Sequence, residues 1–358
     1  MTPPSRSHAL EGGSRSVCLW LFVVAGFVFT MVVVGGATRL TGAGLSITEW
    51  KPVTGAIPPL DEAAWAAAFD KYRASSQYHL INQGISLANF KVLYWWEWAH
   101  RLLGRWVGVV FAAPFIAFLA LRRLPRPLIG RCFLLLGLGG LQGLVGWWMV
   151  ESGLEGRASV APERLLAHLG LALLLLAALV WTALDAGFGV APPDRSRRQD
   201  AWGWATLGFA GFVFFQCLLG ALVAGNAAGL IDNDWPLMGG RVFPADYWQS
   251  DFWTTLAHGR PSVQFNHRLI AYGLIAYGLG LAVVGVRRRS QLPAVAPLAM
   301  LCAGLLLAQA GLGVATLLLG DPLVLALGHQ ANAALLLVSA TALAWQSHRK
   351  PSIPIPYE

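Results

Sequence analysis

Residues 17–38 read VCLWLFVVAGFVFTMVVVGGAT, a stretch that contains no charged side chain. A helix needs about 20 mostly apolar residues to cross the hydrocarbon core of a bilayer, so this stretch alone predicts a membrane span. Its apolar run is longer than that of a cleavable signal peptide, and no small-residue cleavage site follows it. We therefore expect residues 17–38 to form a retained transmembrane helix.

Seven further stretches of this kind follow along the 358-residue chain. The whole chain is 56% hydrophobic and only 12% charged, which is about half the charge of an average soluble protein. This composition excludes an ordinary soluble enzyme, a disordered chain and a secreted disulfide scaffold. We predict an all-α integral membrane protein whose eight transmembrane helices span 17–38, 93–121, 132–150, 165–184, 201–224, 262–286, 294–318 and 324–346.

The charged residues of the predicted loops are distributed unequally between the two sides of the membrane. One side, which includes both termini, carries fourteen basic and five acidic residues, whereas the other carries nine basic and twelve acidic residues. Cytoplasmic loops are enriched in Lys and Arg, so both termini should be cytoplasmic. The net charge of +8 is therefore a topology signal, and no nucleic-acid partner is needed to explain it.

An internal repeat relates the two halves of the chain. An offset of 185 residues aligns Ala43-Gly44-Leu45 with Ala228-Gly229-Leu230, and an offset of 167 aligns His100-Arg101-Leu102 with His267-Arg268-Leu269. Because the repeat unit holds four helices, we predict two pseudo-symmetric four-helix bundles. The expected parts are a cytoplasmic tail (1–16), an N-terminal bundle (17–184), a cytoplasmic linker (185–200), a C-terminal bundle (201–346) and a second tail (347–358).

Four histidines lie inside the predicted spans, one in each even-numbered helix. They are His100, His168, His267 and His329. An ionisable group at membrane depth is costly and therefore suggests a function. Each histidine lies near the outer end of its helix, so each half should place two imidazoles at one level, where they could ligate one haem iron.

Two other interpretations of these histidines are less favoured. Hydrogen bonds between helices would explain one such residue, but they explain a matched set of four poorly. A structural zinc site needs four clustered ligands, whereas the two pairs should lie in separate bundles. The four cysteines fall in or at the ends of odd-numbered helices, where they are expected to be small core residues.

Charged residues beside the histidines distinguish the two halves. Arg101, Arg105 and Arg268 suit the carboxylates of haem propionates, although anchoring to lipid headgroups is an equal alternative. Glu97 lies three residues before His100 and shares its helix face, while its repeat partner is Gln264. The asymmetry predicts catalysis in the N-terminal half and a permanent haem in the C-terminal half. A salt bridge between Glu97 and Arg101 is the alternative.

Four motifs resemble the heme A synthase family, and the resemblance covers residues 17–345. They are GGATRLTGAGLSITEWKPVTGAIPPL (35–60), EWAHRLLGR (97–105), FNHRLIAY (265–272) and GHQANAALL (328–336). The first outer loop carries no cysteine pair, which is similar to the proteobacterial and mitochondrial branch. Mechanistic steps attributed to that pair in other members are therefore in doubt here.

The resemblance implies an enzyme of the bacterial inner membrane that oxidises the C8 methyl group of heme O to the formyl group of heme A, through an alcohol. It implies that His267 and His329 ligate the iron of a haem b cofactor, with Arg268 nearby. His100 and His168 would flank the iron of the substrate haem, with Arg101 and Arg105 binding it and Glu97 as the essential acid.

The resemblance leaves the electron donor unidentified. It suggests contact with the farnesyl transferase that makes heme O, besides membrane lipid, and the sequence is compatible with a homo-oligomer. The alternative function is a di-haem b-type electron carrier, which predicts two equal pockets. A haem transporter would share the pockets without needing Glu97.

Overall fold

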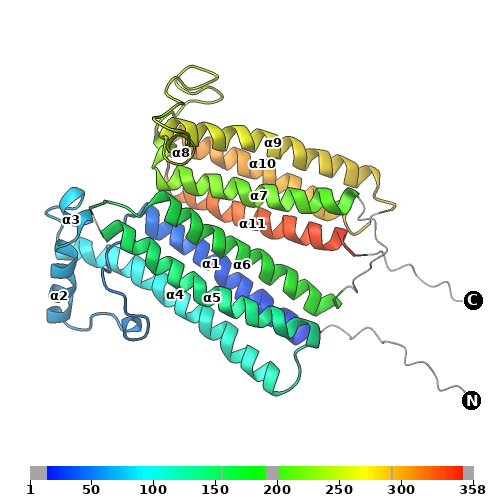
Figure 1. The fold of residues 1–358 in the computed structure, drawn as a ribbon, viewed down its shortest axis with the longest axis horizontal. Coiled ribbons are helices and arrows are strands. Elements are labelled where there is room, and N and C mark those ends of the chain that lie inside the picture. The colour runs from blue at the N-terminus through cyan, green and yellow to red at the C-terminus, as the bar shows by residue number, and fades with distance from the viewer. Residues whose placement is uncertain (1–13, 155, 191–200, 292, 350–358) are drawn as a thin grey trace, which may run out of the picture.

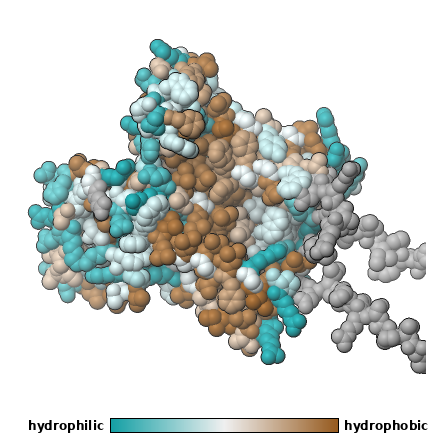
Figure 2. Space-filling model, in the orientation of Figure 1, coloured by the Kyte–Doolittle hydropathy of each residue, from teal (hydrophilic) through white to brown (hydrophobic). Residues whose placement is uncertain are grey.

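The computed structural model describes residues 14–154, 156–190, 201–291 and 293–349, which form helices and loops without a β-strand. Figure 2 shows hydrophobic residues gathered across the middle of the molecule. Eight described helices are long and apolar enough to cross a membrane, and they run side by side in Figure 1. They are α1 (Arg15–Leu40), α4 (Leu87–Ala120), α5 (Arg126–Leu154), α6 (Pro162–Phe188), α7 (Ala201–Gly225), α9 (Arg260–Arg287), α10 (Ala296–Leu318) and α11 (Leu323–Ser347). The chain is a multi-pass membrane protein, and the predicted all-α fold with eight spans is confirmed.

Several helices extend beyond their expected ends. α4 begins six residues early, where the Ser86 hydroxyl accepts a hydrogen bond from the Asn89 backbone N–H at 3.2 Å. At 1.5 Å per residue its 34 residues span about 51 Å, well beyond a hydrocarbon core of about 30 Å. α6 continues to Phe188, so Asp185 is a buried helix residue and not part of a loop. Hydropathy marks only the lipid-facing part of a helix, whereas caps and polar contacts set its ends.

The long predicted outer loops contain short helices of their own. The first holds η1 (Thr54–Ala56), α2 (Glu62–Arg73) and α3 (Ser76–Leu80), and the second holds η2 (Ala228–Leu230) and α8 (Phe252–Ala257). In Figure 1, α2, α3 and α8 lie at one end of the molecule, and α1 begins and α11 ends at the other. The expected tails and inner linker (1–16, 185–200 and 347–358) lie largely outside the described residues.

Contacts between neighbouring helices close into two rings. α1 contacts α4 and α6, and α5 contacts the same two helices; likewise α11 contacts α7 and α10, and α9 contacts the same two. α4 and α6 therefore occupy opposite corners of the first ring, and α9 and α11 those of the second. Contacts of α6 with α7 and of α11 with α1 and α6 join the rings.

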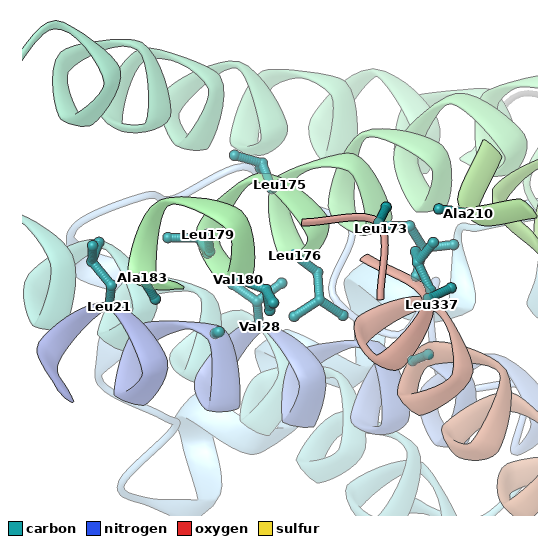
Figure 3. Packing of buried hydrophobic residues seen from close by; sticks show 14 of the residues in the cluster. Leu21, Val28, Leu173, Leu175, Leu176, Leu179, Val180, Ala183, Ala210 and Leu337 are labelled. Carbon is teal, nitrogen blue, oxygen red and sulfur yellow. The ribbon is translucent and has the colours of Figure 1, made fainter. Parts of the chain in front are cut away.

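The apolar core lies where the two rings meet. Figure 3 shows Leu176 and Val180 of α6 pointing towards Val28 of α1, with Leu337 of α11 nearby. A polar contact crosses the same region, because the Gln330 side chain on α11 donates to the Val32 carbonyl of α1 at 2.5 Å. This hydrogen bond helps to set the position of His329, the neighbour of Gln330, relative to α1.

Candidate functional site

The four predicted histidines lie on helices that face each other across the two rings. His100 lies on α4 and His168 on α6, and His267 lies on α9 and His329 on α11. All four side chains are partly exposed rather than sealed in the core. α4 and α6 lie at opposite corners of the first ring, and α9 and α11 at those of the second. Each ring therefore carries the two histidines of one predicted pair, and their joint binding of a haem stays a prediction.

Each imidazole lies against a glycine of the preceding long helix. A Cβ atom added to Gly146 would lie 2.8 Å from Cε1 of His168, and one added to Gly313 would lie 2.9 Å from Cε1 of His329. The corresponding glycine is Gly220 for His267, at 3.3 Å, and Gly35 for His100, at 3.0 Å. Any side chain larger than hydrogen would push against the ring, so these glycines fix where each imidazole can lie.

Three of the imidazoles also contact a glutamine, which the sequence reasoning only partly identified. The side-chain nitrogen of Gln142 lies 3.2 Å from Nδ1 and 3.5 Å from Nε2 of His168. That of Gln216 lies 3.0 and 3.5 Å from the same two atoms of His267, and that of Gln309 lies 3.1 and 3.2 Å from those of His329. Each glutamine precedes its glycine by four residues, one helical turn. The offset of 185 aligns Gly35 with Gly220 but Met31 with Gln216, so the repeat does not identify Gln216.

Glu97 is buried and lies beside the first outer loop. Its carboxylate accepts hydrogen bonds from the Ser46 hydroxyl at 2.7 Å and from the Ile47 backbone N–H at 2.6 Å. It also forms a salt bridge of 2.5 Å with Arg101. The ion pair considered as an alternative is therefore present, and the same carboxylate fastens the loop to α4.

Arg101 and Arg268 make matching contacts in the two halves. Arg101 donates to the carbonyls of Ile47 at 2.6 Å and Glu49 at 2.8 Å, whereas Arg268 donates to those of Asp232 at 2.6 Å and Asp234 at 2.9 Å. The acceptors correspond under the offset of 185. Both guanidinium groups therefore hold an outer loop against the helix that carries a histidine.

Arg105 differs from these two arginines. It donates to the carbonyls of Pro52 and Lys51 at 2.7 and 2.8 Å, but its buried Nη1 has no hydrogen-bond partner. A buried unpaired donor is costly unless a ligand satisfies it. The described residues include no group of three or more His, Cys, Asp or Glu side chains that could hold a metal ion.

Comparisons with known proteins agree with this arrangement. The family model COX15-CtaA, described as cytochrome oxidase assembly protein, matches residues 18–341. The chain is 58% identical to the heme A synthase of Caulobacter sp. (strain K31) over 94% of this chain and 97% of the relative. It is 48% identical to that of Paracoccus denitrificans (strain Pd 1222) over 90% and 85%, respectively. The chain therefore belongs to the COX15-CtaA family, and its relatives within that family are heme A synthases.

Proposed function

We propose that this protein is a heme A synthase that oxidises the C8 methyl group of heme O, through the alcohol, to the formyl group of heme A. The observation that carries the proposal is the pair of histidines across each helix ring, of which only the N-terminal pair has a buried carboxylate beside it. Two histidine pairs of similar construction that differ in the carboxylate beside them suit a resident haem and a substrate haem.

The C-terminal ring fits a haem b cofactor. His267 and His329 lie on helices at opposite corners of this ring. Gly220 and Gly313 leave room for their imidazoles, and Gln216 and Gln309 contact these imidazoles. These contacts limit how each imidazole can turn. Haem b supplies a one-electron relay when bound, and Arg268 keeps the loop at 232–234 over its pocket.

The N-terminal ring holds the substrate in this proposal. His100 and His168 flank the iron of heme O, and the unpaired Nη1 of Arg105 is placed to receive a propionate. Arg101 acts with Glu97 to hold residues 46–49 close to the pocket. Glu97 assists proton transfer or positions water near the substrate methyl group.

The proposal includes the setting of the protein. We place it in the bacterial inner membrane with both termini in the cytoplasm, because the predicted inner loops carry the excess of arginine. The two contact rings then correspond to the N-terminal and C-terminal four-helix bundles. The farnesyl transferase that makes heme O is the proposed neighbour, and an oligomer would form within the same membrane.

Identification of the bound pigments tests this function directly. The purified full-length protein is extracted with acidified organic solvent, and the released haems are identified by mass. Haem b together with heme O, its alcohol or heme A is the expected result. Two haem b molecules per chain, with no farnesylated haem, would overturn the proposal in favour of a di-haem electron carrier.

A further inference from the structure

His100 departs from the construction that the other three histidines share. His168, His267 and His329 each have a glutamine side chain within 3.2 Å of Nδ1. The position that corresponds to these glutamines on α1, four residues before Gly35, is Met31. Among the described residues no hydrogen-bond partner of the His100 ring is found.

Met31 occupies the space one turn below His100. A Cβ atom added to Gly104, which follows His100 by one helical turn, would lie 3.2 Å from the terminal methyl group of Met31. A thioether has no N–H or O–H to donate and is a weak acceptor at best. Met31 therefore supplies no polar group at the sequence position where Gln142, Gln216 and Gln309 contact the other imidazoles.

The His100 ring is also turned differently towards its glycine. A Cβ atom on Gly146 or Gly313 would be nearest Cε1 of the facing ring, with Nε2 the farther nitrogen at 3.7 Å. A Cβ atom on Gly35 would instead be nearest Nε2 of His100, at 3.0 Å. The Nε2 atom of His100 thus faces Gly35 of α1, whereas Cε1 is the ring atom that faces the glycine in the other three histidines.

We propose that His168 is the fixed ligand of the substrate iron and that His100 is the exchangeable one. The glutamine contacts limit how the other three imidazoles can turn, whereas no side-chain hydrogen bond among the described residues holds the His100 ring in this way. When the bond from iron to His100 breaks, its electron pair stays on the nitrogen, and a small neutral ligand takes the vacated position. This inference rests on the proposed function and adds which face of heme O opens.

The position of Glu97 agrees with an open face on the His100 side. Glu97 lies on α4 three residues before His100, and its carboxylate contacts the outer loop above the same helix. The carboxylate nearest the pocket thus lies on the side where iron would exchange its ligand. Beside His168, Gln142 donates to the backbone carbonyl of His168 at 3.0 Å, and no hydrogen bond between a carboxylate and His168 is found among the described residues.

A substitution that supplies the missing partner tests the inference. Met31→Gln should fix the His100 ring, lower the high-spin fraction of the heme O-loaded protein and slow carbon monoxide binding to its reduced form. We expect a change of about three- to tenfold, the factor that one hydrogen bond commonly contributes. Met31→Leu conserves volume without adding a polar group, so it should match the wild type.

A second variant distinguishes the two sides of the iron. Gln142→Met removes the partner of His168, and we expect the protein to lose heme O about three- to tenfold faster. Unchanged spin state and carbon monoxide rate in Met31→Gln would overturn the inference, as would unchanged heme O retention in Gln142→Met. Haem b content checks that each variant folds, and a wild type without farnesylated haem would instead refute the proposed function.

Discussion

Gly313→Ala should empty the C-terminal haem pocket with little change elsewhere. The new Cβ would lie 2.9 Å from Cε1 of His329, whereas ordinary contacts begin at 3.4 Å, so the ring must retreat by about 0.5 Å. Space for that movement is limited, because Gln309 contacts the same ring and Gln330 ties the next residue to α1. Overpacking of this kind costs about 1–3 kcal/mol.

That cost converts into a measurable loss of haem. If it falls on the haem-bound form, the affinity for haem b drops about 5- to 150-fold, at 1.4 kcal/mol per factor of ten. Gly311→Ala on the same helix is the matched control, because no atom lies within 4 Å of its added Cβ. That control should keep its haem and gain stability, since alanine is favoured over glycine in a helix by about 0.5–1 kcal/mol.

The assay is a titration of purified protein with haem, followed by absorbance of the reduced haem b band and by thermal unfolding. Gly313→Ala should bind haem b weakly and unfold at a temperature that responds little to added haem. Equal haem b affinity in Gly313→Ala and Gly311→Ala would refute the placement of His329 against this glycine. A loss in Gly311→Ala alone would refute the assignment of the pocket to this face of α10.

Three further predictions concern other contacts. Glu97→Gln removes the charge that pairs with Arg101 and gives position 97 the residue type of Gln264. Heme A output should fall at least tenfold while the haem b content stays normal. Full heme A output with normal haem content would show that the carboxylate is dispensable. Asp185→Asn removes the buried carboxylate that accepts from Arg131 and from Trp345 Nε1; it should destabilise the protein by about 1–3 kcal/mol, and an unchanged unfolding temperature would argue against this joint between α5, α6 and α11. Hydrogen bonds from Lys71 and Lys51 hold the pKa of Glu49 below its usual value of 4.5. Their stabilising contribution is therefore present above pH 4.5 and is lost as the pH falls through the lowered pKa. Amide hydrogen exchange around residue 49 should speed up only in that acidic range, and Glu49→Gln should remove this pH dependence.

The sequence predicted the parts of this protein that depend on hydropathy and spacing. The apolar runs identified all eight spans, since a bilayer requires about 20 apolar residues wherever a helix crosses it. The repeat predicted one histidine in each of four spans, and these histidines lie on α4, α6, α9 and α11. Residues outside the lipid were harder to predict, and α2 and α3 were missed because they are short and only partly apolar.

Side-chain partners were predicted less well than positions. Arg101, Arg105 and Arg268 were expected at haem propionates, but the structure gives all three contacts to loop carbonyls. Spacing along a helix shows that Glu97 shares a face with His100, yet it gives no information on how a loop fifty residues earlier folds back to meet the carboxylate. The long-range contacts of Ser46 and Ile47 decide where Glu97 points.

The differences between the two halves cluster on one side of one pocket. His168 keeps the glutamine and glycine that also support His329, so the α5–α6 side repeats the α10–α11 side. The α1–α4 side has diverged from α7–α9, since Met31 replaces Gln216 and Glu97 replaces Gln264. A pocket that only carried electrons would gain nothing from losing a partner of its histidine and burying a carboxylate beside it. Both changes weaken a permanent haem site, and both suit a site where the iron must exchange a ligand and a proton must move.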